Sequence, residues 1–304
     1  MTTTTTPDTH VVVVVPGFIQ GAAAVDLKTR SLLQHLDDAG LTPVLAPLPG
    51  RGAPPGAGDA RFHDYVVLVD DVVHHHQRAG HRVSVIGHSL GGLIASALPI
   101  ATQLQLHRRV VVASPLLPSV TTPLARVVDP LLLPLANGLH RAGVPFPGAL
   151  FGQAFHLARR GMNLPWMRHP LQVWAPGAFD DDEWRDVLQE GFVRDSFGVL
   201  ADLLHLKHSD GRRTLGLDVD ERLTFAGAPP TLVIAGDLDG IAPQASVEQL
   251  FHRLGSHDKE FVVAGKQTAG VRFGHVDLLI GRHAPAFVWP RLLRFLVDDR
   301  RGSR

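Results

Sequence analysis

The chain has no cysteine among its 304 residues, and this absence removes several kinds of chemistry. Thiol nucleophiles, disulfide bonds and thiolate metal sites are all excluded. An excess of one charge is also absent, because 29 lysines and arginines balance 29 aspartates and glutamates. Basic residues do not cluster, so we expect neither nucleic-acid binding nor attraction to an anionic membrane.

The N-terminus lacks the features of a targeting segment. Residues 1–9 contain neither a basic region nor an apolar region, and they are predicted to form a disordered tail. The apolar run Val11–Val15 is far too short to cross a bilayer. We therefore expect a cytoplasmic protein with no stable insertion into a membrane.

Motifs that hold cofactors are absent as well. Neither a Gly-X-Gly-X-X-Gly pattern nor a Walker pattern follows the early strands, so no cofactor is predicted. The run His74-His75-His76 does not make a metal motif, because adjacent residues on a helix point about 100° apart and ligands need a spacing of four. We predict a solvated helix end there and no metal site.

Strand and helix patterns alternate over the first 115 residues. The β-branched run His10–Val15 predicts a strand that is buried on both faces. The later strands are predicted at 42–46, 82–86 and 109–113, and the helices at 25–39, 62–78 and 90–98. This alternation is typical of a parallel sheet with right-handed crossovers.

The alternation stops after residue 115 and returns near residue 226. In between, the sequence has apolar helical fragments punctuated by proline and no clear strand. The best helix there is predicted to begin at Asp180, to have a capping box with Glu183, and to continue to Leu206.

Two further strands are predicted at 231–235 and 260–264, so the sheet resumes after the interruption. We therefore predict one α/β core rather than two domains. The core would consist of residues 10–115 and 226–304, and residues 116–225 would form a helical cap or lid inserted after the fourth predicted strand.

The stretch Gly87-His88-Ser89-Leu90-Gly91 lies between a predicted strand and a predicted helix. A tight turn at such a place pushes the serine hydroxyl outward, and only glycine at 87 and 91 lets the strand and the helix pass so closely. We interpret Ser89 as a nucleophile, which needs a base, an acid that orients the base, and N–H donors for an oxyanion. The alternative is a glycine-rich turn with a capping serine.

With this motif in this context, the chain resembles the α/β-hydrolase superfamily, in particular serine esterases and lipases with a helical cap. The resemblance covers nearly everything outside the predicted cap and implies the α/β-hydrolase fold, a mostly parallel sheet flanked by helices. The family's triad has the order Ser, then Asp or Glu, then His. Its acid loop matches Gly236–Pro243, which selects Asp239, three residues after the glycine. Asp237 remains the alternative acid, with a turn carboxylate as its other role.

The family's order also implies the other members of the site. His275 in the last loop would take the proton of Ser89 while Asp239 holds its tautomer. The oxyanion donors would be the backbone N–H groups of Leu90 and Phe18, the latter in a Pro-Gly-Phe turn where many relatives have His-Gly-X.

Three more residues near these motifs are assigned a candidate role. His88 is common beside the nucleophile in relatives and is a candidate pocket residue. Gln20 is a second candidate for the pocket, with the protein surface as its alternative. Asp277 is predicted to cap the helix that follows His275.

The resemblance implies a serine hydrolase that cleaves a carboxylic ester through an acyl-enzyme on Ser89. The predicted cap has three of the four tryptophans and the apolar run Leu131–Leu135, so we expect a small-molecule ester or acyl substrate that is partly apolar. Acyl transfer or thioester cleavage with the same triad is one alternative. A ligand-binding receptor that keeps the fold without turnover is another. Neither the substrate nor the oligomeric state follows from the sequence.

Overall fold

A computed structural model of the chain describes residues 9–48, 60–116, 123–164, 172–208 and 217–298. Its centre is a sheet of six parallel strands in the order β2-β1-β3-β4-β7-β8. The strands are β1 (His10–Val15), β2 (Thr42–Leu45), β3 (Arg82–His88), β4 (Arg108–Val112), β7 (Thr231–Gly236) and β8 (Lys259–Ala264). The predicted parallel sheet flanked by helices is therefore confirmed.

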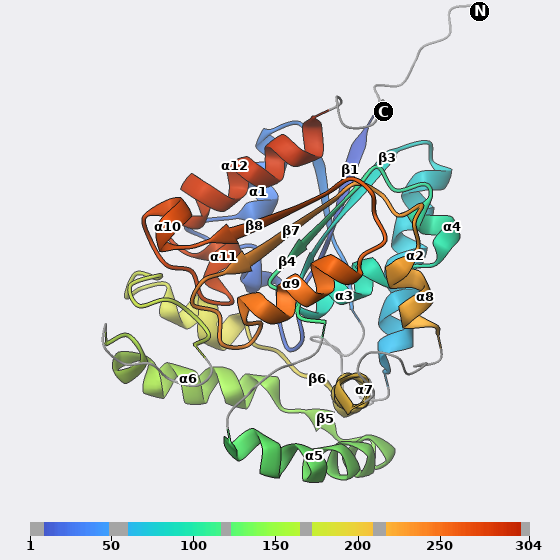
Figure 1. The fold of residues 1–304 in the computed structure, drawn as a ribbon. Helices are drawn as coiled ribbons and strands as arrows, with labels where there is room; N and C mark the ends of the chain where they lie inside the picture. The colour runs from blue at the N-terminus through green and yellow to red at the C-terminus, as the bar shows by residue number, and fades with distance from the viewer. Residues whose placement is uncertain (1–8, 49–59, 117–122, 165–171, 209–216, 299–304) are drawn as a thin grey trace, which may run out of the picture.

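Helices cover both faces of this sheet (Figure 1). On one face lie α1 (Leu32–Asp38) and α12 (Ala284–Val297), and on the other lie α2 (Phe62–Arg78), α3 (Leu90–Ser96) and α9 (Gln244–Arg253). Shorter helices stand at loop positions: η1 (Ala22–Ala24), α4 (Ile100–Gln103), α10 (Lys266–Ala269) and α11 (Asp277–Ile280).

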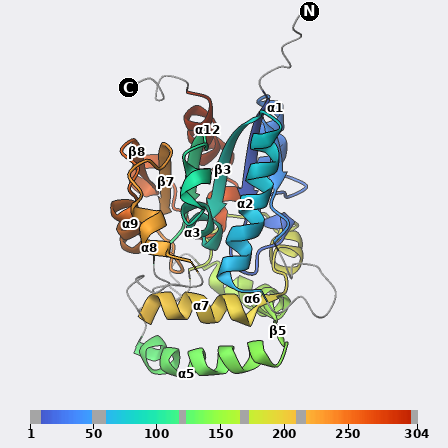
Figure 2. The same cartoon turned by 90° about the vertical axis from the view of Figure 1, so that its right-hand side faces the viewer.

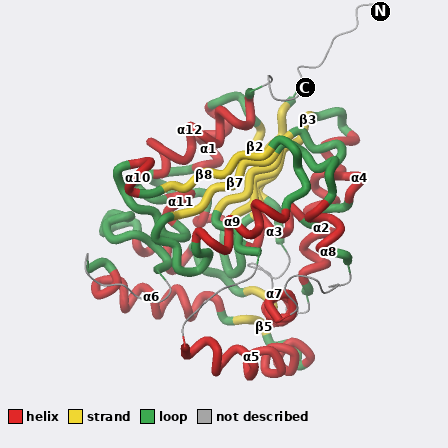
Figure 3. The backbone as a smooth tube through the Cα atoms, in the orientation of Figure 1, coloured by secondary structure: helices red, strands yellow, loops and turns green. Residues whose placement is uncertain are grey.

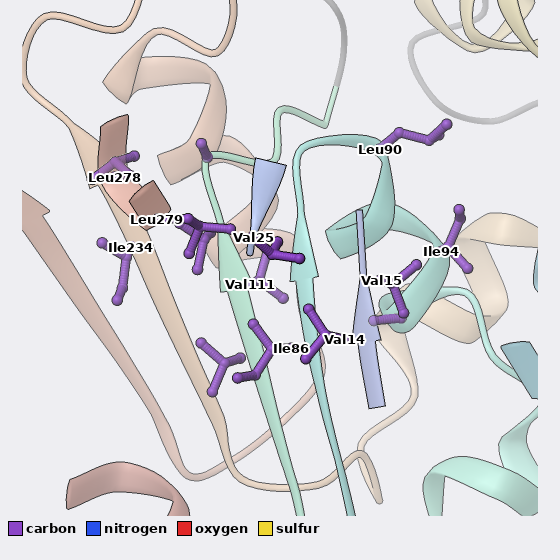
Figure 4. Packing of buried hydrophobic residues seen from close by; sticks show 14 of the residues in the cluster. Val14, Val15, Val25, Ile86, Leu90, Ile94, Val111, Ile234, Leu278 and Leu279 are labelled. Carbon is purple, nitrogen blue, oxygen red and sulfur yellow. The ribbon is translucent and has the colours of Figure 1, made fainter. Parts of the chain in front are cut away.

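The core lies between the sheet and these two helical layers. All residues of Val11–Val15 are at most 1% exposed, as a strand buried on both faces requires. Figure 4 shows buried side chains from four strands of the sheet, Val14, Ile86, Val111 and Ile234, packed with residues of the flanking helices. Full burial of such a side chain stabilises the fold by about 1.5 to 3 kcal/mol.

The chain between β4 and β7 forms a separate group of elements, and we call residues 116–225 the β4–β7 segment. It contains α5 (Pro123–Arg141), β5 (Pro145–Phe146), α6 (Gly148–Met162), η3 (Asp186–Glu190), β6 (Asp195–Ser196), α7 (Phe197–His208) and α8 (Val219–Thr224). Helices α5, α6 and α7 lie beyond the carboxyl ends of the sheet strands, with α5 outermost (Figures 1 and 2). In the described ranges, no helix combines the length and the apolar character needed to cross a membrane.

The helix predicted from Asp180 to Leu206 is wrong as one continuous element. A single π-helical turn, η3, occupies Asp186–Glu190, and α7 begins only at Phe197. The intervening residues hydrogen-bond to the loop after β1 instead, with Gly21 N–H donating to Gly191 O at 2.9 Å. These tertiary bonds and the antiparallel pair β5–β6 outweigh the helical periodicity. Loops lie between the sheet and α6 at this end of the molecule (Figure 3).

The first helix is shorter than predicted. Instead of spanning 25–39, α1 begins after Ser31, whose Oγ accepts a hydrogen bond from Gln34 N–H at 2.9 Å and caps the helix. Gly40, with φ of 79°, ends the helix as predicted. The helix over 62–78 is confirmed as α2.

Candidate active site

Ser89 occupies the turn between β3 and α3. Its backbone has φ of 54° and ψ of −120°, a conformation that residues other than glycine rarely adopt. The turn is held by a hydrogen bond from Ser89 N–H to Val112 O at 2.8 Å. Ser89 is a partly exposed residue, whereas His88 and Leu90 on either side are buried. The turn therefore places one partly exposed serine between two buried neighbours.

Close contacts explain the glycines around this turn. A Cβ atom on Gly87 would lie 2.3 Å from Gly91 O, and one on Gly91 would lie 2.0 Å from Val15 O. Both distances are far below van der Waals contact, so any side chain would push strand and helix apart. A Cβ atom on Gly17 would lie 2.8 Å from the Cβ atom of Ser89. The loop after β1 thus packs directly against Ser89.

His275 and Asp239 form a buried pair at the carboxyl end of the sheet. His275 Nδ1 donates to Asp239 Oδ2 at 2.7 Å, and the two side chains are 4% and 0% exposed. Asp239 Oδ1 accepts from the N–H groups of Ile241 and Ala242 at 2.9 and 2.8 Å. Because an ionised carboxylate only accepts, Nδ1 carries the hydrogen and Nε2 keeps a lone pair for a proton.

Asp237, the alternative acid, lies in a different environment. Its carboxylate accepts hydrogen bonds from Lys266 N–H at 3.1 Å and from Phe273 N–H at 3.0 Å. These bonds tie together the start and the end of the loop that follows β8. Of the two aspartates that follow β7, Asp239 is therefore the one in contact with His275.

Gln20 and His88 are both buried and connect the loops of the site. Gln20 Oε1 accepts from Gly17 N–H at 2.6 Å and lies 2.8 Å from His88 Nδ1. His88 Nε2 lies 3.0 Å from the backbone oxygen of His275. Burial, reinforced by the neighbouring His275, lowers the pKa of His88 to about 3. A neutral His88 thus lies between the loop after β1 and the backbone of His275.

The two backbone N–H groups predicted for an oxyanion belong to residues next to these contacts. Phe18 follows Gly17, which packs against Ser89, and Leu90 is the first residue of α3. Neither N–H has a hydrogen-bond acceptor among the residues that the structure describes. Both donors thus remain available to a ligand.

The β4–β7 segment holds the backbone around His275. The N–H groups of His275 and Val276 both donate to Val173 O, at 2.9 and 3.0 Å. A backbone oxygen of the segment therefore holds the stretch of backbone that carries the His275 side chain.

Asp277 does not cap the following helix, contrary to the prediction. Val276 stands at the N-cap of α11, and the Asp277 carboxylate accepts from Gly274 N–H at 3.0 Å and from Ala175 N–H at 3.3 Å. Burial raises the pKa of this carboxyl to about 7, against the hydrogen bonds that favour its ionised form. Ala175 is 102 residues away, so no local pattern could predict the contact.

Phe18 contacts one end of a group of aromatic rings. Its ring centroid is 5.0 Å from that of Phe146, which itself lies 5.3 Å from Phe151 and 5.1 Å from Phe197. All three of these rings come from the β4–β7 segment. An aromatic group of the segment therefore lies against the side chain of Phe18.

The tryptophans and leucines of the predicted cap do not lie together. Trp174 and Trp184 are at most 1% exposed and pack on each other with centroids 5.0 Å apart. Leu131 and Leu135 are exposed on α5, and Trp166 lies outside the described residues. In the part of the chain that is described, no group of three His, Asp or Glu side chains is placed to hold a metal ion.

Comparisons with known proteins agree with this architecture. The sequence profile of the Alpha/beta hydrolase family matches residues 12–279. The fold is similar to that of a monoacylglycerol lipase from Paleococcus ferrophilus, with a TM-score of 0.64 at 17% identity over 95% of this chain and 94% of that one. Comparison with curated proteins finds no match for the sequence.

Two other solved structures are similar over nearly the whole chain. A soluble variant of monoglyceride lipase from Saccharomyces cerevisiae has a TM-score of 0.63 at 15% identity, over 96% of this chain and 88% of that one. A thioesterase domain from the curacin biosynthetic pathway has a TM-score of 0.57 at 17% identity, over 96% and 92%. At these identities the likeness shows the fold alone.

Proposed function

The chain belongs to the α/β-hydrolase family, and on this basis we propose that it is a serine hydrolase that cleaves a carboxylic ester. The observation that carries the proposal is the buried pair of Asp239 and His275, joined at 2.7 Å on the loops that follow β7 and β8. Ser89 supports it as a partly exposed residue in a strained turn at the same edge of the sheet. The three residues also occur in the family's order.

The proposed reaction has two half-reactions. Ser89 Oγ attacks the ester carbonyl carbon while His275 Nε2 takes the hydroxyl proton, and the N–H groups of Phe18 and Leu90 donate to the oxyanion. The tetrahedral intermediate then expels the alcohol, which receives the proton from His275. Water, deprotonated by His275, attacks the acyl-enzyme and releases the carboxylic acid and free Ser89. Asp239 keeps Nδ1 protonated throughout and stabilises the imidazolium.

The substrate of this proposal is a small ester that is apolar in part. The rings of Phe18, Phe146 and Phe151 support an acyl or alkyl group of this character near the oxyanion donors. We assign the β4–β7 segment the role of a lid that excludes water from the site, on the basis of its place beyond the carboxyl ends of the strands.

Thioester cleavage is the second candidate, because the first half-reaction would be the same. The similarity in fold to a thioesterase domain favours including it. Acyl transfer differs only in the acceptor that replaces water. Comparing an oxygen ester with the thioester of the same acyl group, with and without an added alcohol, separates these reactions.

The test measures hydrolysis of p-nitrophenyl esters of increasing acyl length by the wild type and by Ser89→Ala. We expect turnover by the wild type and its loss, by a factor of about 10³ or more, in Ser89→Ala. Ser114→Ala is the matched control, because Ser114 follows the neighbouring strand β4 and is buried. Turnover that survives Ser89→Ala would refute the nucleophile. Ligand binding by a wild type without turnover would favour a receptor.

A further inference from the structure

The loop after β1 is paired with the β4–β7 segment along its backbone. Val193 N–H donates to Ile19 O at 2.8 Å, and Gly21 N–H donates to Gly191 O at 2.9 Å. Gln20 and Phe192 form an antiparallel bridge between these two bonds. The residues on either side of Gln20 thus depend on the segment for their hydrogen bonds.

Asp195, in β6 of the same segment, adds a side-chain contact to this loop. Its Oδ2 accepts from Ile19 N–H at 2.7 Å, and its Oδ1 accepts from the hydroxyl of Tyr65 at 2.5 Å and from Ser196 N–H at 2.8 Å. Asp195 is 1% exposed and Tyr65 is fully buried. A buried carboxylate with three donors is held rigidly, so it fixes the direction of the Ile19 N–H.

The conformation of Ile19 needs such a partner. Its φ is 56°, in the left-handed region that a β-branched residue rarely adopts. A strained backbone of this kind persists only where surrounding contacts determine it. The peptide that carries the Ile19 N–H is next to the peptide that carries the Phe18 N–H. Fixing the first peptide therefore restricts the direction of the second.

We propose that Asp195 is a positioning residue for the oxyanion site, acting through Ile19 on the N–H of Phe18. The inference rests on the proposed ester hydrolysis, in which that N–H stabilises the oxyanion. It follows that the oxyanion donor of the core is in place only while β6 of the β4–β7 segment is docked against the loop. A lid that leaves this position would also disable the transition-state contact.

Glu183, another buried carboxylate of the segment, serves as a control for Asp195. It also joins the segment to the core, but at a place away from Ile19. Glu183 accepts from Thr29 Oγ1 and from Arg30 Nη2, each at 2.5 Å, and these partners precede α1. Burial opposes its ionisation, but these hydrogen bonds and that from Asp180 N–H lower the pKa of Glu183 below its usual value. Glu183→Gln thus weakens a segment-to-core contact without touching Ile19.

The experiment compares the ester kinetics of Asp195→Asn, Tyr65→Phe and Glu183→Gln. The asparagine side chain has one acceptor oxygen, whereas the carboxylate accepts from Ile19 N–H on one oxygen and from Tyr65 and Ser196 on the other. We therefore expect kcat to fall about 10- to 100-fold, with KM within about threefold of the wild type. Tyr65→Phe removes one of the donors that hold Asp195 but keeps the bond to Ile19, so kcat should fall less than in Asp195→Asn. Glu183→Gln does not touch the loop after β1, so its kcat should stay within about threefold of the wild type.

A second variant carries the test if Asp195→Asn does not fold. A Cβ atom on Gly21 would lie 2.8 Å from Val193 Cγ1, so Gly21→Ala pushes the segment away from the loop while Asp195 stays intact. We expect the same loss of kcat at unchanged KM. The proposal would be overturned if Asp195→Asn and Gly21→Ala both kept the kcat of the wild type and only lowered the melting temperature, as Glu183→Gln does. Asp195 would then be a purely structural residue.

Hydrogen–deuterium exchange measures the protection of the loop after β1 independently of ester hydrolysis. Amides of residues 17–21 should exchange faster in Asp195→Asn than in the wild type. In Glu183→Gln their exchange rates should equal those of the wild type. If the wild type has no turnover that depends on Ser89, faster exchange confined to Asp195→Asn still supports its hold on the loop, and the failure belongs to the proposed ester chemistry. Equal exchange in the two variants would overturn the role of Asp195.

Discussion

The parallel core and the β4–β7 segment contribute in different ways to the same site. The core supplies the reactive side chains of the proposed mechanism, Ser89, Asp239 and His275, from three loops at the carboxyl edge of its sheet. The segment instead contacts the backbone at and beside the site: Val173 O accepts from His275 N–H, and Asp195 accepts from Ile19 N–H in the loop after β1. The difference teaches that reactive groups and the contacts that aim them can come from distinct parts of one chain.

The two regions also differ in how they are packed. Residues Val11–Val15 of β1 are buried and apolar, whereas the segment contacts the core through buried carboxylates, among them Asp195, Glu183 and Asp202. Its outer helices leave large apolar side chains in solvent, such as Leu157 at 83% exposure. Substitutions should therefore have effects that depend on which of these surfaces they touch.

The largest effect is expected in the core, at Asp239. Asp239→Asn removes the acceptor that keeps His275 Nδ1 protonated, so we expect kcat for ester hydrolysis to fall about 10³- to 10⁴-fold. Asp237→Asn is the matched change, two residues away in the same loop, and should lower kcat less than about tenfold. The opposite ranking of the two variants would transfer the acid role to Asp237.

The next largest effect is expected on stability, inside the β4–β7 segment. Leu188 is fully buried in η3, so Leu188→Ala should lower the free energy of unfolding by about 2 to 5 kcal/mol. Chemical denaturation measures this loss. A loss below about 1 kcal/mol would mean that the segment unfolds apart from the core and does not share its stability.

A smaller, pH-dependent effect is expected where the two regions meet, at Asp277. Its pKa is raised from 3.8 to about 7 in the folded protein, so between these values the folded carboxyl keeps a proton that the unfolded one has lost. The free energy of unfolding should therefore fall as the pH rises from about 4 to 7, by about 1 to 3 kcal/mol.

Asp277→Asn removes this titration and keeps an acceptor for Gly274 N–H. Urea unfolding at pH 5 and pH 8 should show a larger loss for the wild type than for Asp277→Asn. Equal losses in the two proteins would show that the carboxyl is ionised throughout this range.

The smallest effect is expected on the outer surface of the segment. Leu157→Ser changes a side chain on α6 that is mostly in solvent, so the free energy of unfolding should change by less than about 0.5 kcal/mol. Chemical denaturation of Leu157→Ser and Leu188→Ala under the same conditions compares the two losses of stability directly. A large loss for Leu157→Ser would show that this face is covered in solution.

The sequence predicts the core better than the segment, and the reason is physical. The valines of Val11–Val15 and the glycines at 87 and 91 meet local requirements, burial on both strand faces and close passage of a helix, so short patterns reveal them. The break between η3 and α7 comes from backbone bonds to the loop after β1, which override the helical spacing seen from Asp180 onward.

The supporting residues of the site escape sequence reasoning for the same reason. Asp195 meets Ile19 across 176 residues and Tyr65 across 130, and no motif surrounds it. A lone aspartate between Arg194 and Ser196 has no pattern that separates it from a surface residue. A positive φ at Ile19 is likewise invisible in the sequence Pro16-Gly17-Phe18-Ile19-Gln20.

The central claim, that Ser89 is acylated in the course of ester hydrolysis, is tested most directly by locating a covalent adduct. The protein is incubated with a serine-directed fluorophosphonate, digested and analysed by peptide mass spectrometry. The account predicts one adduct, on Ser89 in the peptide that contains Gly87 and Gly91, and none after Ser89→Ala. An adduct on another residue, or labelling that persists in Ser89→Ala, would contradict it.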